Sequence, residues 1–154
     1  YKNLKLKMVN DNLRLEIIGD GPLLSSVEAA AKLDNTIICH GSIIDESIIA
    51  PIMSRSSIVF IPGHSGLSIN HAFAYGRPYV TSDGPSQPPE VDYIINAVNG
   101  YFLKDSFEEN LKTLVELLTN KEKLQLFCDN AKTQGEFLSV ENWVKQIKNA
   151  LLDE

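Results

Sequence analysis

Short, uninterrupted apolar runs, each followed by a segment with helical spacing, constrain the fold of this chain more than any other feature. Such runs are expected as strands at Leu13–Ile18, Thr36–Cys39, Ser57–Ile61, Pro78–Ser82 and Gly100–Lys104. A strand without polar alternation is buried on both faces, as in a parallel sheet whose crossover connections are helices. The pattern therefore predicts an α/β fold: a doubly wound, Rossmann-like parallel sheet with helices on both faces.

Helical spacing fills the segments between and after these strands. Helices are expected at Leu23–Leu33, Glu46–Ser56, Leu67–Gly76, Phe107–Thr119, Asn120–Phe137 and Val140–Leu152. Pro51 cannot sit in an undisturbed helix, so that helix is expected either to kink or to start near Pro51. Gly76 is a helix stop. Asp105 or Ser106 can cap the next helix, because each has a Glu three residues later.

Composition narrows the class of protein. The chain has 154 residues and a net charge of −6, which suits a single domain over 1–154 and argues against nucleic-acid binding. No apolar run is long enough to span a bilayer, and the first residues do not resemble a secretory signal. Cys39 and Cys128 are far apart and outside any metal-like spacing, which favours reduced thiols and a cytoplasmic location.

The stretch "FIPGHSGLSINHAFAYGRPYV" is the strongest functional signal. Gly63 and Gly66 let a bulky anion approach the backbone, and Ser65 and Ser68 add hydroxyl groups. The helix expected near Leu67 leaves main-chain N–H groups unpaired at its start, and such groups bind phosphate. The alternative is an ordinary helix start capped by serine. No lysine follows the loop, so it is not a Walker-type phosphate loop.

Other motifs are weaker. The segment "IIGDGPLL" places Gly19 and Gly21 between a strand and a helix, but Leu24 occupies the third glycine of a dinucleotide fingerprint. A nicotinamide or flavin cofactor is therefore not expected, and a tight turn without a ligand is the alternative. His71 and, as a further candidate, His64 flank the glycine-rich loop and could contact a ligand. No histidine or acidic cluster has the spacing of a metal site.

The order of these motifs resembles the C-terminal, donor-binding domain of a family-four (group 1) glycosyltransferase of GT-B fold. The similarity rests on "GDGP", "HGSI", "IPGHSGLSINHAFAYGRPYV" and "PPEVDYIINAVNGYFL", followed by terminal helices. It extends from about Leu13 to Trp143. Members of that family transfer a sugar, with retention, from a nucleotide-diphosphate sugar to an acceptor.

The resemblance implies positions for the donor site. Gly21 would line the donor cleft, and Gly41 and Ser42 would border the pocket for the base. Glu90 matches an acidic residue at the end of a mobile loop. The residues implied to meet the diphosphate and sugar are Ser65, Gly66, Leu67 and Ser68, with His71 near the ribose. The catalytic residue is left unassigned and no metal is expected. No cofactor is expected either, because the nucleotide sugar is itself a substrate.

The sequence also departs from the family pattern. Gly63 and His71 stand where the family usually has two glutamates, and a glycine cannot replace a carboxylate. The basic pair that clamps the diphosphate in the family has no equivalent in "YKNLKLKMVN". The first strand of the domain and the whole N-terminal acceptor domain are therefore expected to lie outside this sequence.

These observations predict the donor-binding half of a retaining glycosyltransferase. The expected partners are a nucleotide-sugar donor and a glycan or lipid-linked acceptor, in a parent protein that is cytoplasmic or peripheral on the cytoplasmic membrane face. Polysaccharide biosynthesis is the expected process, and the fragment alone is expected to be inactive. A non-catalytic nucleotide-sugar module and a domain like that of a nucleotide-sugar 2-epimerase are alternatives. A receiver-type signalling domain is a third, although "FIPGHSG" lacks the phosphoacceptor Asp.

Overall fold

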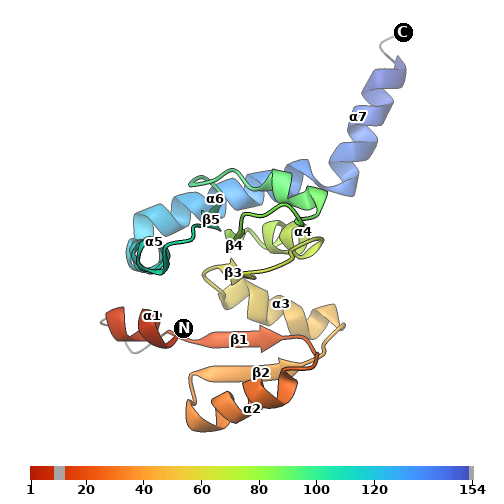
Figure 1. Ribbon diagram of the computed structural model, residues 1–154. Helices are drawn as coiled ribbons and strands as arrows, with labels where there is room; N and C mark the ends of the chain where they lie inside the picture. Colours follow the sequence, from red (N-terminus) through yellow and green to blue (C-terminus); the bar gives the residue numbers. More distant parts are fainter. Residues whose placement is uncertain (9–12, 153–154) are drawn as a thin grey trace. The chain divides into compact units, whose positions relative to one another are not determined.

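The structure, a computed structural model, describes residues 1–8 and 13–152. The chain forms two compact units, residues 1–55 and residues 56–154, and both are drawn in Figure 1. All strand pairs within the described residues are parallel, as predicted. The strands belong to a two-stranded sheet in the first unit and a three-stranded sheet in the second. The predicted α/β class, with parallel strands flanked by helices, is confirmed.

The first unit is built around two parallel strands. Its elements are α1 (Lys2–Lys7), β1 (Leu15–Ile18), α2 (Leu24–Leu33), β2 (Ile37–Gly41) and α3 (Glu46–Arg55). The register pairs Leu15 with Ile37, and α2 packs beside β2 (Figure 1). β1 begins two residues later than predicted.

Helix α3 runs through Pro51 instead of starting there. The Asp45 carboxylate accepts a hydrogen bond from the Ser47 N–H (2.9 Å) and fixes the helix start at Glu46. Pro51 has no N–H to donate to the carbonyl of Ser47, which costs one helical hydrogen bond. Ile49 and Ile52 are buried on the inner side of α3, and this packing stabilises the helix. The predicted start near Pro51 is therefore wrong.

A three-residue ionic cluster joins β1, β2 and α3 of this unit. Glu16 accepts hydrogen bonds from Arg55 Nε (2.8 Å) and Nη2 (2.6 Å), and its Oε2 lies 2.8 Å from His40 Nε2. The Glu16 side chain is 12% exposed. The Arg55 guanidinium is the main cause that holds the pKa of Glu16 below its usual value, and burial acts against it. A forked arginine–carboxylate contact of this kind ties the end of α3 to the sheet.

Glu16→Gln should reduce stability in a pH-dependent way. Because the folded-state pKa of Glu16 is lowered, its contribution is present above the ordinary value of 4.5 and is lost as the pH falls through the folded-state pKa. Urea unfolding should show the largest difference between wild type and variant near pH 7, shrinking below pH 4.5. Glu28→Gln, at an exposed position on α2, is the control. A Glu16→Gln effect that stays constant with pH would contradict this assignment.

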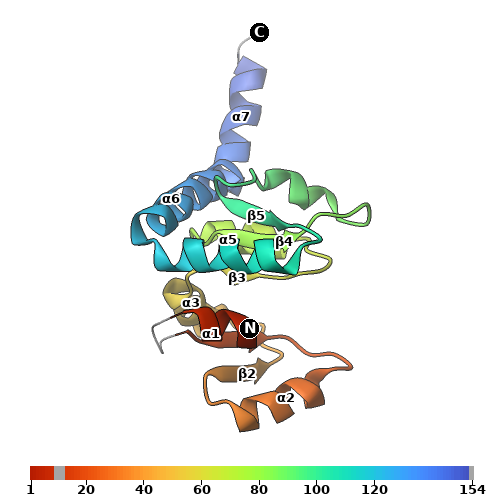
Figure 2. The same cartoon turned by 60° about the vertical axis from the view of Figure 1, so that its left-hand side comes forward.

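The second unit contains the longer part of the chain. Its elements are β3 (Val59–Phe60), α4 (Ser68–Ala74), β4 (Tyr79–Ser82), the 3₁₀ helix η1 (Pro89–Tyr93), β5 (Gly100–Leu103), α5 (Phe107–Thr119), α6 (Lys121–Phe137) and α7 (Val140–Leu152). β4 lies between β3 and β5. Figure 1 shows α6 running beside α4, and the two helices are in extensive contact. Figure 2 shows α5 next to α6.

Local signals for the ends of helices are confirmed in this unit. Gly76 follows α4 with a φ of 61°, in the left-handed region that favours glycine. Of the two predicted caps for α5, Ser106 acts: its Oγ accepts a hydrogen bond from the N–H of Glu109 at 3.3 Å. Ser139 similarly accepts from the N–H of Asn142 at the start of α7 (3.2 Å).

Two glycines permit close packing of main chains. A Cβ on Gly100 would lie 2.2 Å from the carbonyl oxygen of Tyr79, so β4 and β5 approach only because residue 100 has no side chain. A Cβ on Gly135 would lie 2.3 Å from the carbonyl oxygen of Phe73, where α6 crosses α4. Ile69, Phe73 and the neighbouring Leu117 are fully buried in this core.

Gly135→Ala should destabilise the protein although alanine is the better helix former. The intrinsic helix preference favours alanine by about 1 kcal/mol, but the overlap with the Phe73 carbonyl forces the two helices apart, at a cost of about 1–3 kcal/mol. Thermal unfolding should show a lower Tm. Gly84→Ala is the matched control, because nothing lies within 4 Å of the added methyl group. An unchanged or raised Tm for Gly135→Ala would mean that the crossing tolerates a wider separation.

Candidate functional site

The predicted anion-binding residues form one continuous loop in the second unit. This glycine loop, Gly63–Ser68, follows β3 and leads directly into α4. Gly66 adopts a φ of 68°, a left-handed conformation that a β-branched residue would adopt only with strain. Leu67 is 73% exposed, whereas Ile69, two residues further on, is fully buried. Ser65, Gly66, Leu67 and Ser68 are consecutive residues at the end of this loop, where α4 begins.

The serine hydroxyls of the loop face β4. Ser68 Oγ donates to the carbonyl of Ser65 (2.8 Å) and lies 2.6 Å from the hydroxyl of Tyr79. Since the Ser68 hydroxyl has one hydrogen, Tyr79 is the donor in the second bond. Ser65 Oγ lies 2.8 Å from Thr81 Oγ1. In this structure both serine side chains hold the loop to the sheet.

Tyr79 and Thr81 supply these partners because they alternate along β4. Residues two apart in a strand lie on the same face, and both side chains are completely buried. A buried hydroxyl requires a hydrogen-bond partner. The two hydroxyls of β4 therefore fix the conformation of the glycine loop.

Gln87 holds the same loop from the segment between β4 and η1. Its Nε2 donates to the carbonyl of Gly63 (2.9 Å) and to that of Ser82 (2.8 Å). Its Oε1 accepts from the main-chain N–H of Ser65 (3.2 Å). The next residue, Pro88, would be 3.8 Å from a Cβ on Gly66.

The last three main-chain N–H groups of the loop, which lead into α4, form an unpaired run. Within the described residues, the N–H groups of Gly66, Leu67 and Ser68 donate no hydrogen bond to the protein. They are strong donors that require water or a ligand as acceptor. Helix α4 has only seven residues, so its dipole is small and the amides themselves are the main attraction for an anion.

The remaining predicted contacts lie around this loop or in the other unit. His64 is exposed within the loop, and His71 is on α4, where its ring meets that of Tyr75 edge-on at 5.4 Å. Glu90 belongs to η1, which packs against α4.

Gly21, Gly41 and Ser42 belong to the first unit. Gly21 follows β1, Gly41 is the last residue of β2, and Ser42 comes next. Gly41 has a φ of 68°, and its carbonyl accepts from the N–H of Gly19 at 2.7 Å. The Gly21 N–H donates to Asp20 Oδ1 at 2.7 Å. The parallel pairing of β1 and β2 places these glycine turns at one edge of their sheet.

Sequence reasoning missed Tyr79, Thr81 and Gln87. The alternation of hydroxyl-bearing residues in "PYVTS" was a usable signal, because buried hydroxyls on one strand face need partners nearby. Gln87 had no local signal beyond its place in the irregular stretch "SDGPSQPPE".

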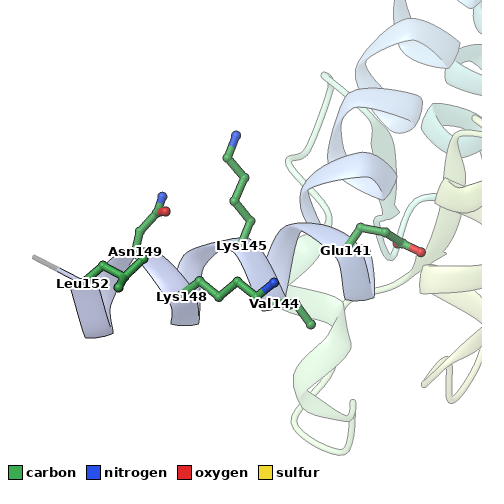
Figure 3. Close-up of a pocket in the computed structure, with 6 residues that line it drawn as sticks. All are labelled: Glu141, Val144, Lys145, Lys148, Asn149 and Leu152. Carbon is green, nitrogen blue, oxygen red and sulfur yellow. The ribbon is translucent and has the colours of Figure 1, made fainter.

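A hollow on the C-terminal helix does not compete with this site. A hollow of about 340 Å³ follows α7 and is lined by Glu141, Val144, Lys145, Lys148, Asn149 and Leu152 (Figure 3). All of these side chains come from a single helix, so nothing encloses a ligand there. No three His, Cys, Asp or Glu side chains gather as a metal site in residues 1–8 and 13–152, and none of the helices in those ranges is long and apolar enough to cross a membrane.

Residues 2–120 match the sequence model of a protein family described as glycosyl transferases, group 1. The chain belongs to this family. The resemblance that the motifs indicated is thereby confirmed. A comparison of this glycosyltransferase chain with curated proteins gives no match.

Solved glycosyltransferase structures share the fold. A variant of S. aureus TarM, crystallised with fondaparinux, α-GlcNAc-glycerol and UDP, is 18% identical with a TM-score of 0.74, over 96% of this chain and 30% of that one. Anabaena HepE with UDP and glucose is 18% identical (TM-score 0.68; 97% and 42% covered). The pneumococcal O-GlcNAc transferase GtfA with UDP and GlcNAc is 19% identical (TM-score 0.60; 90% and 30% covered). This glycosyltransferase chain thus spans less than half the length of each.

Ser68→Ala in this glycosyltransferase chain should cost about 1–3 kcal/mol, because it leaves the buried Tyr79 hydroxyl without a partner. Tyr79→Phe should cost less, since Ser68 keeps its bond to the Ser65 carbonyl. The double variant should cost less than the sum of the two, which urea unfolding in a double-mutant cycle measures. Ser86→Ala, on an exposed part of the next loop, should have little effect. Simple additivity would mean that the two hydroxyls do not interact.

Proposed function

We propose that this chain is the donor-binding half of a retaining glycosyltransferase that uses a nucleotide-diphosphate sugar. The unpaired main-chain N–H groups of Gly66, Leu67 and Ser68 are the observation that carries the proposal. They form a row of donors on a loop that side chains hold in place. The negatively charged oxygens of a diphosphate are suitable acceptors for such donors. Family membership supplies the class of reaction.

The chemistry explains why such donors matter. During transfer, the bond between the sugar's anomeric carbon and the diphosphate oxygen breaks, and a bond to the acceptor oxygen forms while that oxygen loses its proton. Negative charge builds up on the departing diphosphate. Fixed N–H groups that point at this charge stabilise the transition state, and loss of one such donor costs on the order of 100-fold in rate.

UDP is the nucleotide that we propose for the donor. TarM, GtfA and HepE, which share the fold, were each crystallised with UDP. In this chain the glycine loop would bind the diphosphate, with His71 near the ribose. Glu90 and His64 would border the diphosphate. By the family resemblance, we also propose Gly21, Gly41 and Ser42 as donor-binding residues.

The rest of the reaction requires groups outside this chain. We place the acceptor, a glycan or a lipid-linked sugar, on an N-terminal domain beyond the sequence, and expect the chain alone to be inactive. The proposed reaction needs no cofactor or metal, because the diphosphate is met by N–H donors. The proposal places the parent protein in polysaccharide synthesis, in the cytoplasm or peripheral on the cytoplasmic membrane face.

A non-catalytic nucleotide-sugar module is the second candidate. It is favoured by Gly63 and His71, which stand where the family usually has glutamates, and a Cβ on Gly63 would meet only open space. Release of UDP from a UDP-sugar by the full-length protein, with an acceptor present, separates the two candidates. UDP binding without any turnover across a panel of acceptors would favour the module.

UDP should raise the Tm of the full-length protein, and Gly66→Val should abolish that shift. A ligand at 100 times its Kd adds about 2.7 kcal/mol of stability. Valine at residue 66 cannot adopt a φ of 68° without strain, and its side chain blocks approach to the neighbouring N–H groups. Gly84→Ala is the control, because its methyl group contacts nothing and lies outside the loop. A UDP shift that persists in Gly66→Val would place the diphosphate elsewhere, and no shift in the wild type would refute the proposed donor.

A further inference from the structure

The side chain of Gln87 makes a set of hydrogen bonds that few other residue types could make. Pairing between β3 and β4 ends where the N–H of Ile61 donates to the carbonyl of Val80 (3.0 Å). Beyond that point the main-chain groups of Gly63 and Ser82 face each other without a direct bond. The Gln87 amide fills this gap, donating to the carbonyls of both residues.

The same amide also accepts a hydrogen bond, from the N–H of Ser65. Its side chain therefore acts like an inserted peptide group, with a donor end and an acceptor end, that continues the sheet into the glycine loop. Glutamate has no donor and methionine has neither function, while asparagine is shorter by one methylene group. Glutamine matches this set of contacts in both length and polarity.

The bond from Ser65 has a consequence for the other amides of the loop. Because Gln87 accepts from the N–H of Ser65, that group is withdrawn from any ligand, and the run of unpaired donors that leads into α4 begins at Gly66. Thr81 supports the same arrangement, since its Oγ1 donates to the carbonyl of Gly63 (3.1 Å) and contacts Ser65. Gly63 and Ser65 are thus each held by two side chains, one from β4 and one from Gln87.

We propose that Gln87 is a positioning residue for phosphate binding: it touches no ligand, but holds the glycine loop so that the N–H groups of Gly66, Leu67 and Ser68 are presented together. This inference rests on the proposed function of the loop. It assigns a role to the segment between β4 and η1, where the sequence analysis predicted no site residue.

The test compares two ligands that differ only in the diphosphate. Gln87→Met keeps the approximate shape of the side chain and removes its hydrogen bonds, and Gln87→Ala removes the side chain. Ser86→Ala, at an exposed position on the same segment, is the matched control. NMR titrations of the full-length protein, at a temperature where circular dichroism shows every variant folded, give Kd values for UDP and uridine.

Both Gln87 variants should bind UDP about tenfold more weakly, as expected for loss of one or two effective hydrogen bonds, with uridine affinity within about twofold of wild type. Ser86→Ala should match the wild type for both ligands. Equal weakening of UDP and uridine would overturn the inference, since it would indicate a general structural role. Unchanged UDP binding would also overturn it, and tighter UDP binding would mean that Gln87 competes with phosphate for the Ser65 N–H. Absence of UDP binding by the wild type would instead refute the proposed function itself.

Discussion

The pairing of buried β4 hydroxyls with the serines of the glycine loop is the interaction on which the candidate site depends. Tyr79 and Thr81 are fully buried, so their hydroxyl groups cannot turn to water. Ser68 and Ser65 satisfy them, and in doing so commit their own side chains inward. At the start of α4, the groups that remain for a ligand are three adjacent main-chain N–H groups. An anion at this site would therefore be recognised by backbone donors held in a fixed geometry, the kind of preorganisation that favours charge stabilisation over flexible side-chain contacts.

Close contact between main chains makes this burial of β4 possible. Gly100 lets β5 approach the Tyr79 carbonyl, and Gly135 lets α6 approach the carbonyl of Phe73 on α4. Both glycines lie far from the glycine loop in sequence. They nevertheless set how closely β5 approaches β4 and how closely α6 approaches α4. Asn99 adds to this frame: it is buried, its Oδ1 accepts from the N–H of Ile95 (2.8 Å), and its Nδ2 donates to the carbonyl of Tyr93 (3.1 Å). Asn99 and Gly100 thus both serve the packing of the main chain around β4 and β5.

Membership in the group 1 glycosyltransferases and the local geometry answer different questions. The family gives the class of chemistry, whereas the loop shows which groups of this chain are available for it. Gly63 offers no carboxylate, and the space beside it is open. Its carbonyl is instead used by Gln87 and Thr81 to brace the loop. A departure from the family pattern at residue 63 therefore coincides with a hydrogen-bond network that shapes the loop.

The apolar residues of α7 show that a local sequence pattern does not by itself predict burial. Trp143, Ile147 and Leu151 recur every four residues and define one helical face, as the spacing requires. That face is nevertheless open in the structure, with Trp143 64% exposed. Periodicity fixes which residues share a face, because it depends only on the helix repeat, but it does not supply the surface against which the face packs.

By itself, the sequence determined the class of fold, the parallel strands, a helix cap at Asp105 or Ser106, the stop at Gly76 and the place of the glycine loop. These depend on neighbours within a few residues, through strand patterning, side-chain capping and the conformational freedom of glycine. Only the tertiary structure decided that the Ser65 and Ser68 hydroxyls turn toward β4, that Gln87 reaches back to Gly63, and that α3 passes through Pro51. Each of these rests on a partner distant in sequence or on packing that offsets a local cost, and no local pattern encodes where such a partner will lie.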